Sequence, residues 1–146
     1  MNAYTRILAA VDLREGSRTV IERACELARH GGGSVQLVHV MEFVAVEPMD
    51  DALVPLVQVD DQMLARSRAQ LEALARDFAL PVAACRTEVG NARNEILRCA
   101  REHNSDLIVL GGRERHGLSS LVNLTEDGVL HGAPCDVLAV RIPEPR

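Results

Sequence analysis

The sequence contains few aromatic residues. Among 146 residues there are no tryptophan, one tyrosine and two phenylalanine residues, although 47% of the chain is hydrophobic. A core of this composition is built mainly from valine, leucine, isoleucine and alanine, which is typical of sheets that are covered by helices on both faces. The length favours one domain, spanning residues 1–146, with a sizeable core.

A long apolar run is also missing. No stretch approaches the roughly 20 residues that a membrane-spanning helix needs, and Asp12 follows the first apolar segment too early for a signal peptide. The net charge of −5 argues against non-specific binding of nucleic acid. We therefore expect a cytoplasmic protein that binds neither membranes nor nucleic acids.

The cysteines do not form a C-x-x-C pair; they are Cys25, Cys85, Cys99 and Cys135. Scattered cysteines of a cytosolic protein are usually small buried hydrophobic side chains, and two of these fall at apolar positions of predicted helices. A redox response through a cysteine remains an alternative, which requires an exposed and activated thiolate. The histidines and acidic pairs lack the spacing of metal ligands, so no metal site is predicted.

Strand and helix patterns alternate along the chain, which predicts an open parallel sheet with right-handed crossovers. Ser17 and Asn91 are the expected helix caps, and residues 41–58 show no clean period, so they form either a lid-like or a poorly ordered segment. Apolar runs predict strands over 5–11, 34–40, 81–89, 106–111 and 135–142. Helical spacing predicts helices over 17–30, 60–79, 91–104 and 123–131, and the helix over 60–79 has an apolar stripe of Met63, Leu64, Leu71, Leu74 and Phe78.

Two strand ends carry residues that suit a ligand. Ligands of such sheets bind beyond the carboxyl ends of the strands. The first strand ends at Asp12, and the fourth ends at Gly111 and Gly112. The second of these ends opens the glycine-containing stretch GGRERHGLSSLVNLTED over residues 111–127, which begins like a phosphate-binding loop.

Four stretches together resemble the universal stress protein family, of the UspA type. They are ILAAVDLREGSRTVIERACELA, VQLVHV, EVGNARNEILRCAREHNSDLIVLG, and HGLSSL followed by GVLHGAPCDVLAVR. The resemblance covers nearly the whole chain. It implies an α/β fold with a single five-stranded parallel sheet of strand order 3-2-1-4-5, helices on both faces, and commonly a homodimer that forms through the last strand. It also implies that some members bind ATP and others do not.

The resemblance implies where ATP would bind if binding is retained: at Asp12, Val40, Gly111, Gly117 and Thr125. Three other positions depart from the motif of ATP-binding members. Glu114 stands at the second glycine, and Asn123 and Leu124 replace a Gly-Ser or Gly-Thr pair. Glycines let backbone approach phosphates, and a hydroxyl at a helix N-terminus suits an anion. These replacements therefore favour a degenerate nucleotide site.

The same loop has a structural interpretation. Asn123 and Glu126 form an N-x-x-E capping pattern, and Glu126 and Asp127 would use the positive end of the helix dipole. Asp12 could likewise cap the loop that follows it. The predicted function is a stress-response regulatory or binding module without enzymatic turnover and without a resident cofactor. The alternatives are an ATP-binding switch or weak ATPase of the same fold, and a cysteine-based redox-responsive protein.

Overall fold

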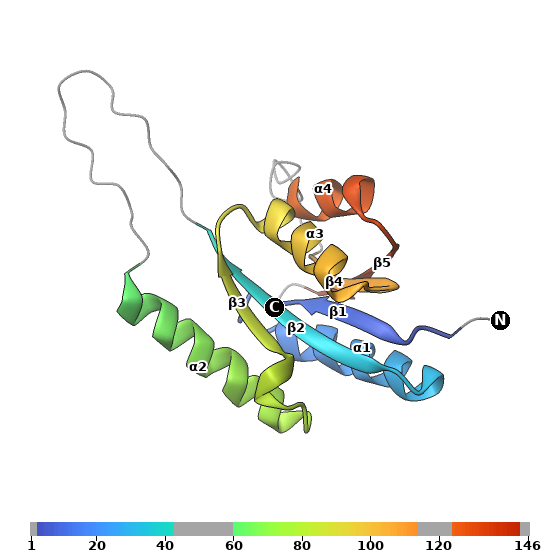
Figure 1. Ribbon diagram of the computed structural model, residues 1–146, viewed down its shortest axis with the longest axis horizontal. Coiled ribbons are helices and arrows are strands. Elements are labelled where there is room, and N and C mark those ends of the chain that lie inside the picture. Colours follow the sequence, from blue (N-terminus) through green and yellow to red (C-terminus); the bar gives the residue numbers. More distant parts are fainter. Residues whose placement is uncertain (1–2, 43–59, 114–123, 144–146) are drawn as a thin grey trace, which may run out of the picture.

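Five strands form one sheet, with helices on both sides of it (Figure 1). The computed structural model describes residues 3–42, 60–113 and 124–143. The strands are β1 (Arg6–Ala10), β2 (Ser34–Met41), β3 (Cys85–Val89), β4 (Leu107–Arg113) and β5 (Asp136–Ile142). The helices are α1 (Ser17–Gly31), α2 (Asp61–Asp77), α3 (Ala92–His103) and α4 (Leu124–Gly132), with a 3₁₀ turn η1 at Val82–Ala84.

The sheet is parallel throughout, and its strand order is β3-β2-β1-β4-β5. This order confirms the expected 3-2-1-4-5 arrangement. In the centre, Ile7 of β1 pairs in register with Val35 of β2 and with Leu107 of β4. From β1 the strands β2 and β3 are added on one side and β4 and β5 on the other, so the strand order reverses between β1 and β4. Sheets of this kind have a crevice for ligands at that point.

Alternating side chains of the central strands fill two separate cores. On one face, Ile7 and Ala9 of β1 pack with buried residues of α1 and α2, including Ile21 and Leu71. On the other face, Leu8 packs with buried residues of α3 and α4. Because β1 is covered on both faces, its sequence is a continuous apolar run without polar alternation.

The helix starts agree with the sequence at some places and differ at others. Asn91 caps α3, because its Oδ1 accepts the N–H of Asn94 at 3.0 Å, and Asp60 caps α2 in the same way. The expectation that Ser17 caps α1 is wrong: Gly16 is the capping residue, and it makes no side-chain cap. Ser17 is buried within the first turn, where its hydroxyl contacts Asp12 instead.

Two further expectations need correction, and a third concerns residues that the structure does not describe. The third strand is shorter than predicted, because Val82–Ala84 form the turn η1 before β3 begins at Cys85. Met63 was expected in the apolar stripe of α2, but it is 39% exposed. Most of the irregular 41–58 segment lies outside the described residues.

Within the described ranges, none of the helices combines the length and apolarity that crossing a membrane requires.

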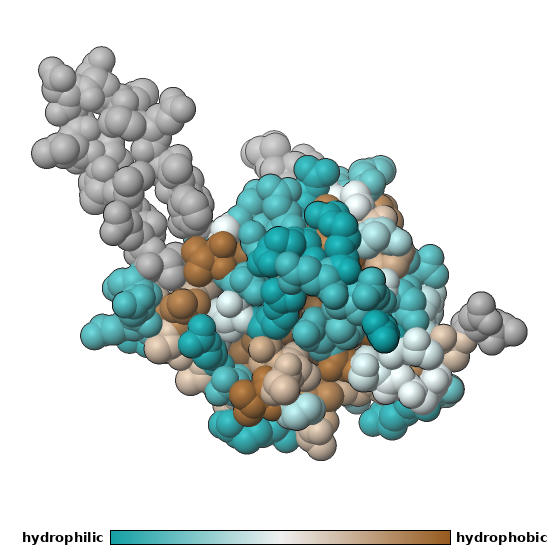
Figure 2. Space-filling view, in the orientation of Figure 1, coloured by the Kyte–Doolittle hydropathy of each residue, from teal (hydrophilic) through white to brown (hydrophobic). Residues whose placement is uncertain are grey.

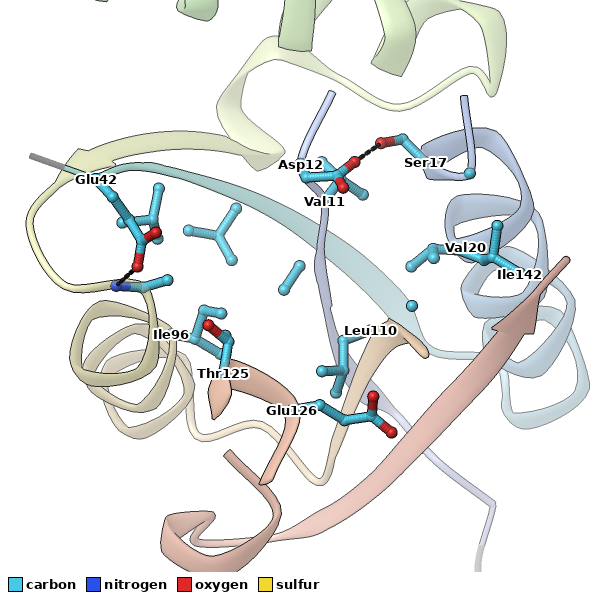
Figure 3. Close-up of a pocket in the computed structure, with 16 residues that line it drawn as sticks. Val11, Asp12, Ser17, Val20, Glu42, Ile96, Leu110, Thr125, Glu126 and Ile142 are labelled. Atoms are coloured by element: carbon cyan, nitrogen blue, oxygen red, sulfur yellow. Dashed lines mark hydrogen bonds between the residues drawn. The ribbon is translucent and has the colours of Figure 1, made fainter. Parts of the chain in front are cut away.

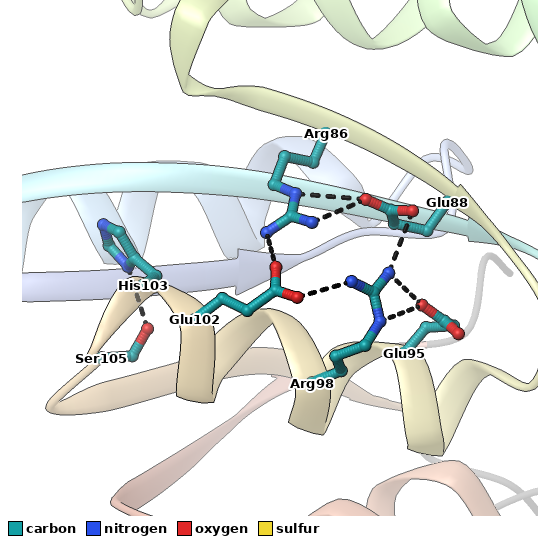
Figure 4. A network of polar contacts seen from close by, with 7 residues as sticks. All are labelled: Arg86, Glu88, Glu95, Arg98, Glu102, His103 and Ser105. Atoms are coloured by element: carbon teal, nitrogen blue, oxygen red, sulfur yellow. Dashed lines mark hydrogen bonds and ion pairs between the residues drawn. The ribbon is translucent and has the colours of Figure 1, made fainter.

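A network of ion pairs holds α3 against the outer strand β3 (Figure 4). Arg86 of β3 contacts Glu88 at 2.9 Å and reaches Glu102 of α3 at 2.8 Å. Arg98 of α3 contacts Glu88 at 3.1 Å and also pairs with Glu95 and Glu102 of its own helix. Networks of this kind contribute more than isolated surface pairs do, so this one ties the middle and the last turn of α3 to β3.

The surface over α3 is accordingly hydrophilic, whereas hydrophobic patches lie near α2 and β3 (Figure 2). Among the described residues, the large hydrophobic side chains that are exposed are Met63, Val82, Val89 and Leu130. They are single residues on different elements, which is ordinary for a protein surface.

Candidate functional site

A pocket of about 240 Å³ lies beyond the carboxyl ends of β1, β2 and β4 (Figure 3). The first turns of three helices, α1, α3 and α4, complete its wall. The lining residues are Ala10, Val11, Asp12, Gly16, Ser17, Val20, Val38, Val40, Glu42, Ala92, Ile96, Leu110, Gly111, Thr125, Glu126 and Ile142. Nine of these sixteen residues are aliphatic and five are polar or charged, so the pocket combines apolar surface with polar groups, as small-molecule sites do.

Four of the five residues assigned by resemblance meet in this pocket. Asp12, Val40, Gly111 and Thr125 all line it, although more than a hundred positions separate the first from the last. Gly117 lies outside the described residues, as do Glu114 and Asn123. Of Leu124, the structure describes only the backbone position as the first residue of α4.

Asp12 has the structural role that the sequence also allowed. Its Oδ1 accepts the N–H of Arg14 at 2.9 Å and the hydroxyl of Ser17 at 3.2 Å. Leu13, which lies between Asp12 and Arg14, has a φ of 65°, in the left-handed region that a non-glycine residue adopts rarely. The carboxylate therefore fixes a tight turn from β1 into α1 while it faces the pocket.

Two glycines of the pocket have a packing reason that the sequence did not reveal. A Cβ added at Gly111 would overlap Cδ1 of Ile142, and one added at Gly16 would lie 2.5 Å from the same atom. Ile142, at the end of β5, is half-buried and inserts its side chain between these two backbone segments. Its role in the site was missed, because nothing local in the sequence connects residue 142 with residues 16 and 111.

Glu126 of α4 lies beside Gly112, the next residue of β4, whose Cβ position faces the opposite side of the sheet from that of Gly111. A Cβ added at Gly112 would lie 3.1 Å from Oε1 and 3.3 Å from Oε2 of Glu126, so the carboxylate occupies the space beside this glycine. Burial, with a smaller contribution from Asp127, raises the pKa of Glu126. Both acids lie in the first turn of α4, as predicted from their position in the sequence.

Glu42 adds a third carboxylate to the pocket, and no local pattern around this residue predicted it. Its Oε1 accepts the N–H of Ala92, the first residue of α3, at 3.1 Å. The described lining residues thus include three carboxylates, from Asp12, Glu42 and Glu126, and no lysine, arginine or histidine. The described part of the pocket wall therefore carries negative charge, although three helix N-termini meet there.

The thiols are unpaired and take no part in this pocket. Cys99 is fully buried, and Cys25, Cys85 and Cys135 are half-buried against the two cores. Burial raises the pKa of all four thiols, which keeps them protonated and weakly nucleophilic. In the described part of the chain, no group of three or more His, Cys, Asp or Glu side chains is arranged to hold a metal ion.

Comparison with known proteins identifies the family. The model of the universal stress protein family matches residues 3–141. The chain belongs to the universal stress protein family. It is 34% identical over 142 residues to universal stress protein A homolog 1 of Coxiella burnetii, a match that covers 97% of this chain and 99% of the relative. It is 24% identical to universal stress protein C of Escherichia coli, over 94% of this chain and 96% of that one.

Solved structures share the fold of this universal stress protein. UspA from Lactobacillus plantarum superposes with a TM-score of 0.72 at 22% identity, covering 97% of this chain and all of that one. A universal stress protein in complex with cAMP superposes with a TM-score of 0.65 at 17% identity, over 95% and 98% of the two chains. At these identities the similarity establishes the α/β architecture.

Proposed function

We propose that this universal stress protein is a binding module of the stress response, working in the cytoplasm without chemical turnover, and that its ligand occupies the pocket of Asp12, Val40, Gly111 and Thr125. The observation that carries the proposal is the convergence of these four residues on one apolar pocket at the reversal point of the sheet. Four unpaired thiols are consistent with a reducing compartment.

The same convergence favours the second candidate, an ATP-binding switch or weak ATPase of this fold. A fold relative was solved with cAMP bound, so an adenine nucleotide fits at least one protein of this architecture. Against a phosphate chain stand Glu126 on the backbone of Gly112 and the absence of a cation from the described pocket wall. We therefore propose that ATP binds weakly, with a dissociation constant well above the micromolar range.

A titration observed by amide NMR tests the binding module. Adenosine, AMP and Mg-ATP should be added separately up to millimolar concentration, and a ligand of the pocket should shift the amides of Gly111, Thr125 and their neighbours. Val40→Phe fills the pocket from β2 and should abolish these shifts. Val89→Phe on the adjacent strand β3, where the side chain is exposed and does not line the pocket, is the matched control.

Three results would contradict this proposal. If no compound shifts any pocket amide, the pocket is not a site for this class of ligand. If shifts survive Val40→Phe, binding occurs elsewhere. A micromolar dissociation constant for Mg-ATP in calorimetry would establish the nucleotide switch in place of the weak binder.

We further propose that the protein is a homodimer that pairs through β5. This strand is an outer strand of the sheet, joined only to β4 in the described chain, and its residues are mainly apolar. An apolar outer strand left open invites uncontrolled pairing. Antiparallel pairing with the same strand of a second copy, about a two-fold axis, would satisfy its free backbone groups.

A further inference from the structure

The end of the pocket beside β4 has the features of an anion site. Gly111 and Gly112 form the carboxyl end of the strand, and the first turn of α4 lies over them. Free N–H groups and the dipole of a helix N-terminus attract negative charge, and glycine lets that charge come close to the backbone. An anion that is part of the protein already lies there: the carboxylate of Glu126 occupies the space beside Gly112, 3.1 and 3.3 Å from where a Cβ of that residue would be.

The other two helices of the pocket carry carboxylates of their own. Asp12 accepts the hydroxyl of Ser17 at the first residue of α1, and Glu42 accepts the N–H of Ala92 at the first residue of α3. Each of the three helix starts that face the pocket therefore has a carboxylate in contact with it or in its first turn. Each of these three carboxylates opposes the attraction that its helix N-terminus would exert on a phosphate.

Two described arginines, Arg93 and Arg141, lie on elements next to α4 and β4 but do not line the pocket. Arg141 of β5 pairs in register with Gly112, and Arg93 of α3 packs against Gly128 with its Nε–H donating to that carbonyl at 3.2 Å. Asp127, in the same turn as Glu126, adds further negative charge and is exposed. Among the described groups, none places a cation inside the cavity where a ligand phosphate would need one.

We propose that Glu126 is a built-in anion that selects the ligand of this pocket: the site takes a molecule with an apolar body and O–H or N–H donors but without a phosphate. The aliphatic wall of Val20, Val38, Ile96 and others suits a heterocyclic or aliphatic body, and the carboxylates accept hydrogen bonds from hydroxyl and amino groups. A nucleoside meets this description and a nucleotide does not. The inference rests on the proposed function, because it assigns a ligand class to the same pocket.

Adenosine and AMP are the probes, because they differ by one phosphate. Calorimetry or NMR titration of the full chain should show that adenosine binds more tightly than AMP. Glu126→Gln should strengthen AMP binding by about tenfold or more, as expected for removal of a like charge a few Å away in a partly buried site. Adenosine affinity should not rise with it: a neutral ligand has no net charge for the carboxylate to repel, so adenosine gains nothing from this change and loses affinity where it donates a hydrogen bond to Glu126.

Asp127→Asn is the matched control. It removes the same charge from the same helical turn, but at an exposed position that does not line the pocket. AMP affinity should change little in this variant. If Glu126→Gln does not fold, as judged by circular dichroism, Glu126→Ser frees the same space and should give the same preference for AMP.

The failures are distinguishable. If AMP binds the unmutated protein as tightly as adenosine, or if the Glu126 variants do not strengthen it, the selection by Glu126 is refuted and the binding pocket stands. If Asp127→Asn strengthens AMP equally, the effect is one of net charge, which also refutes selection at Gly112. If neither probe binds at millimolar concentration, the proposed function fails and this inference fails with it.

Discussion

Gly111→Ala tests whether the glycine at the end of β4 is required by packing. The added Cβ would overlap Cδ1 of Ile142, so this side chain must move. The other atoms within reach are less restrictive: Cγ2 of Val20 would lie at 3.5 Å and Cγ1 of Ile142 at 3.6 Å, which are ordinary contacts. Shortening Ile142 to valine removes the one conflicting atom, so the two substitutions should be coupled.

The expected magnitude follows from opposing effects. Overpacking costs about 1–3 kcal/mol in well-packed cores, and the lower end applies here because Cδ1 is the far end of a half-buried side chain. Alanine recovers roughly 0.5–1 kcal/mol relative to glycine within a strand. Gly111→Ala should therefore lower the free energy of unfolding by up to about 1 kcal/mol on its own, and should become neutral or stabilising when combined with Ile142→Val. The coupling energy should be about 1 kcal/mol.

Urea unfolding followed by far-ultraviolet circular dichroism measures all four members of the cycle, at one protein concentration because a dimer would make stability concentration-dependent. Gly16→Ala supplies the control: its added Cβ would still lie 2.8 Å from Cγ2 of Ile142, an atom that valine retains. Ile142→Val should therefore relieve Gly16→Ala much less. If the cost of Gly111→Ala is the same beside isoleucine and valine, Ile142 is not the reason for this glycine.

Three further predictions concern charge, assembly and the thiols. Because burial raises the pKa of Glu126, its negative charge is lost as the pH falls through that raised value. Binding of cAMP, whose single charge does not titrate in this range, should therefore strengthen as the pH falls. The increase should be smaller in Glu126→Gln. Ala139→Asp in the middle of β5 places like charges across the proposed two-fold axis and should yield monomers in light scattering. Ala73→Asp, on the exposed side of α2, is the control and should leave a dimer. A monomeric unmutated protein would refute the interface. Cys99 should react with a thiol reagent more slowly than the three half-buried cysteines, and rapid labelling of one cysteine coupled to a change of oligomer would instead favour the redox alternative.

The sequence predicted the elements well where the signal is local. The continuous apolar run of β4 and the capping pattern at Asn91 each depend on a few neighbouring residues, and both are confirmed. The strand order depends on contacts between distant segments, and it was expected from family resemblance rather than from periodicity. Ser17 shows the limit of local rules: its type suits a helix cap, but Asp12 accepts its hydroxyl, and the capping residue of α1 is Gly16, one residue earlier.

The candidate site shows the same division. The glycine at 111 suggested a phosphate loop, but Ile142 occupies the space that a Cβ would need there, and this packing reason for glycine depends on how β5 ends. Glu42 could not be assigned at all, because its partner is the backbone of a residue 50 positions later. Glu126 was predicted to use the helix dipole, and its packing on Gly112 adds that its carboxylate also takes the space beside the glycine backbone.

The two carboxylates at α3 and α4 should differ in what they contribute to folding. Glu42 is exposed and accepts the N–H of Ala92, so Glu42→Gln should lower the free energy of unfolding by about 0.3–1 kcal/mol, the usual value of a negative charge at a helix N-terminus. Glu126 accepts no hydrogen bond from the described residues, and its raised pKa means that its ionised form is less favourable in the folded chain than in the unfolded one. Glu126→Gln should therefore leave stability at neutral pH unchanged or slightly increased, measured by the same urea unfolding. A loss as large as that of Glu42→Gln would mean that the dipole of α4 stabilises the charge more than burial opposes it, and Glu126 would then be a cap that happens to line the pocket. If Glu126→Gln loses no stability and binds AMP more strongly, the charge at position 126 acts to exclude a ligand phosphate and not to stabilise the fold.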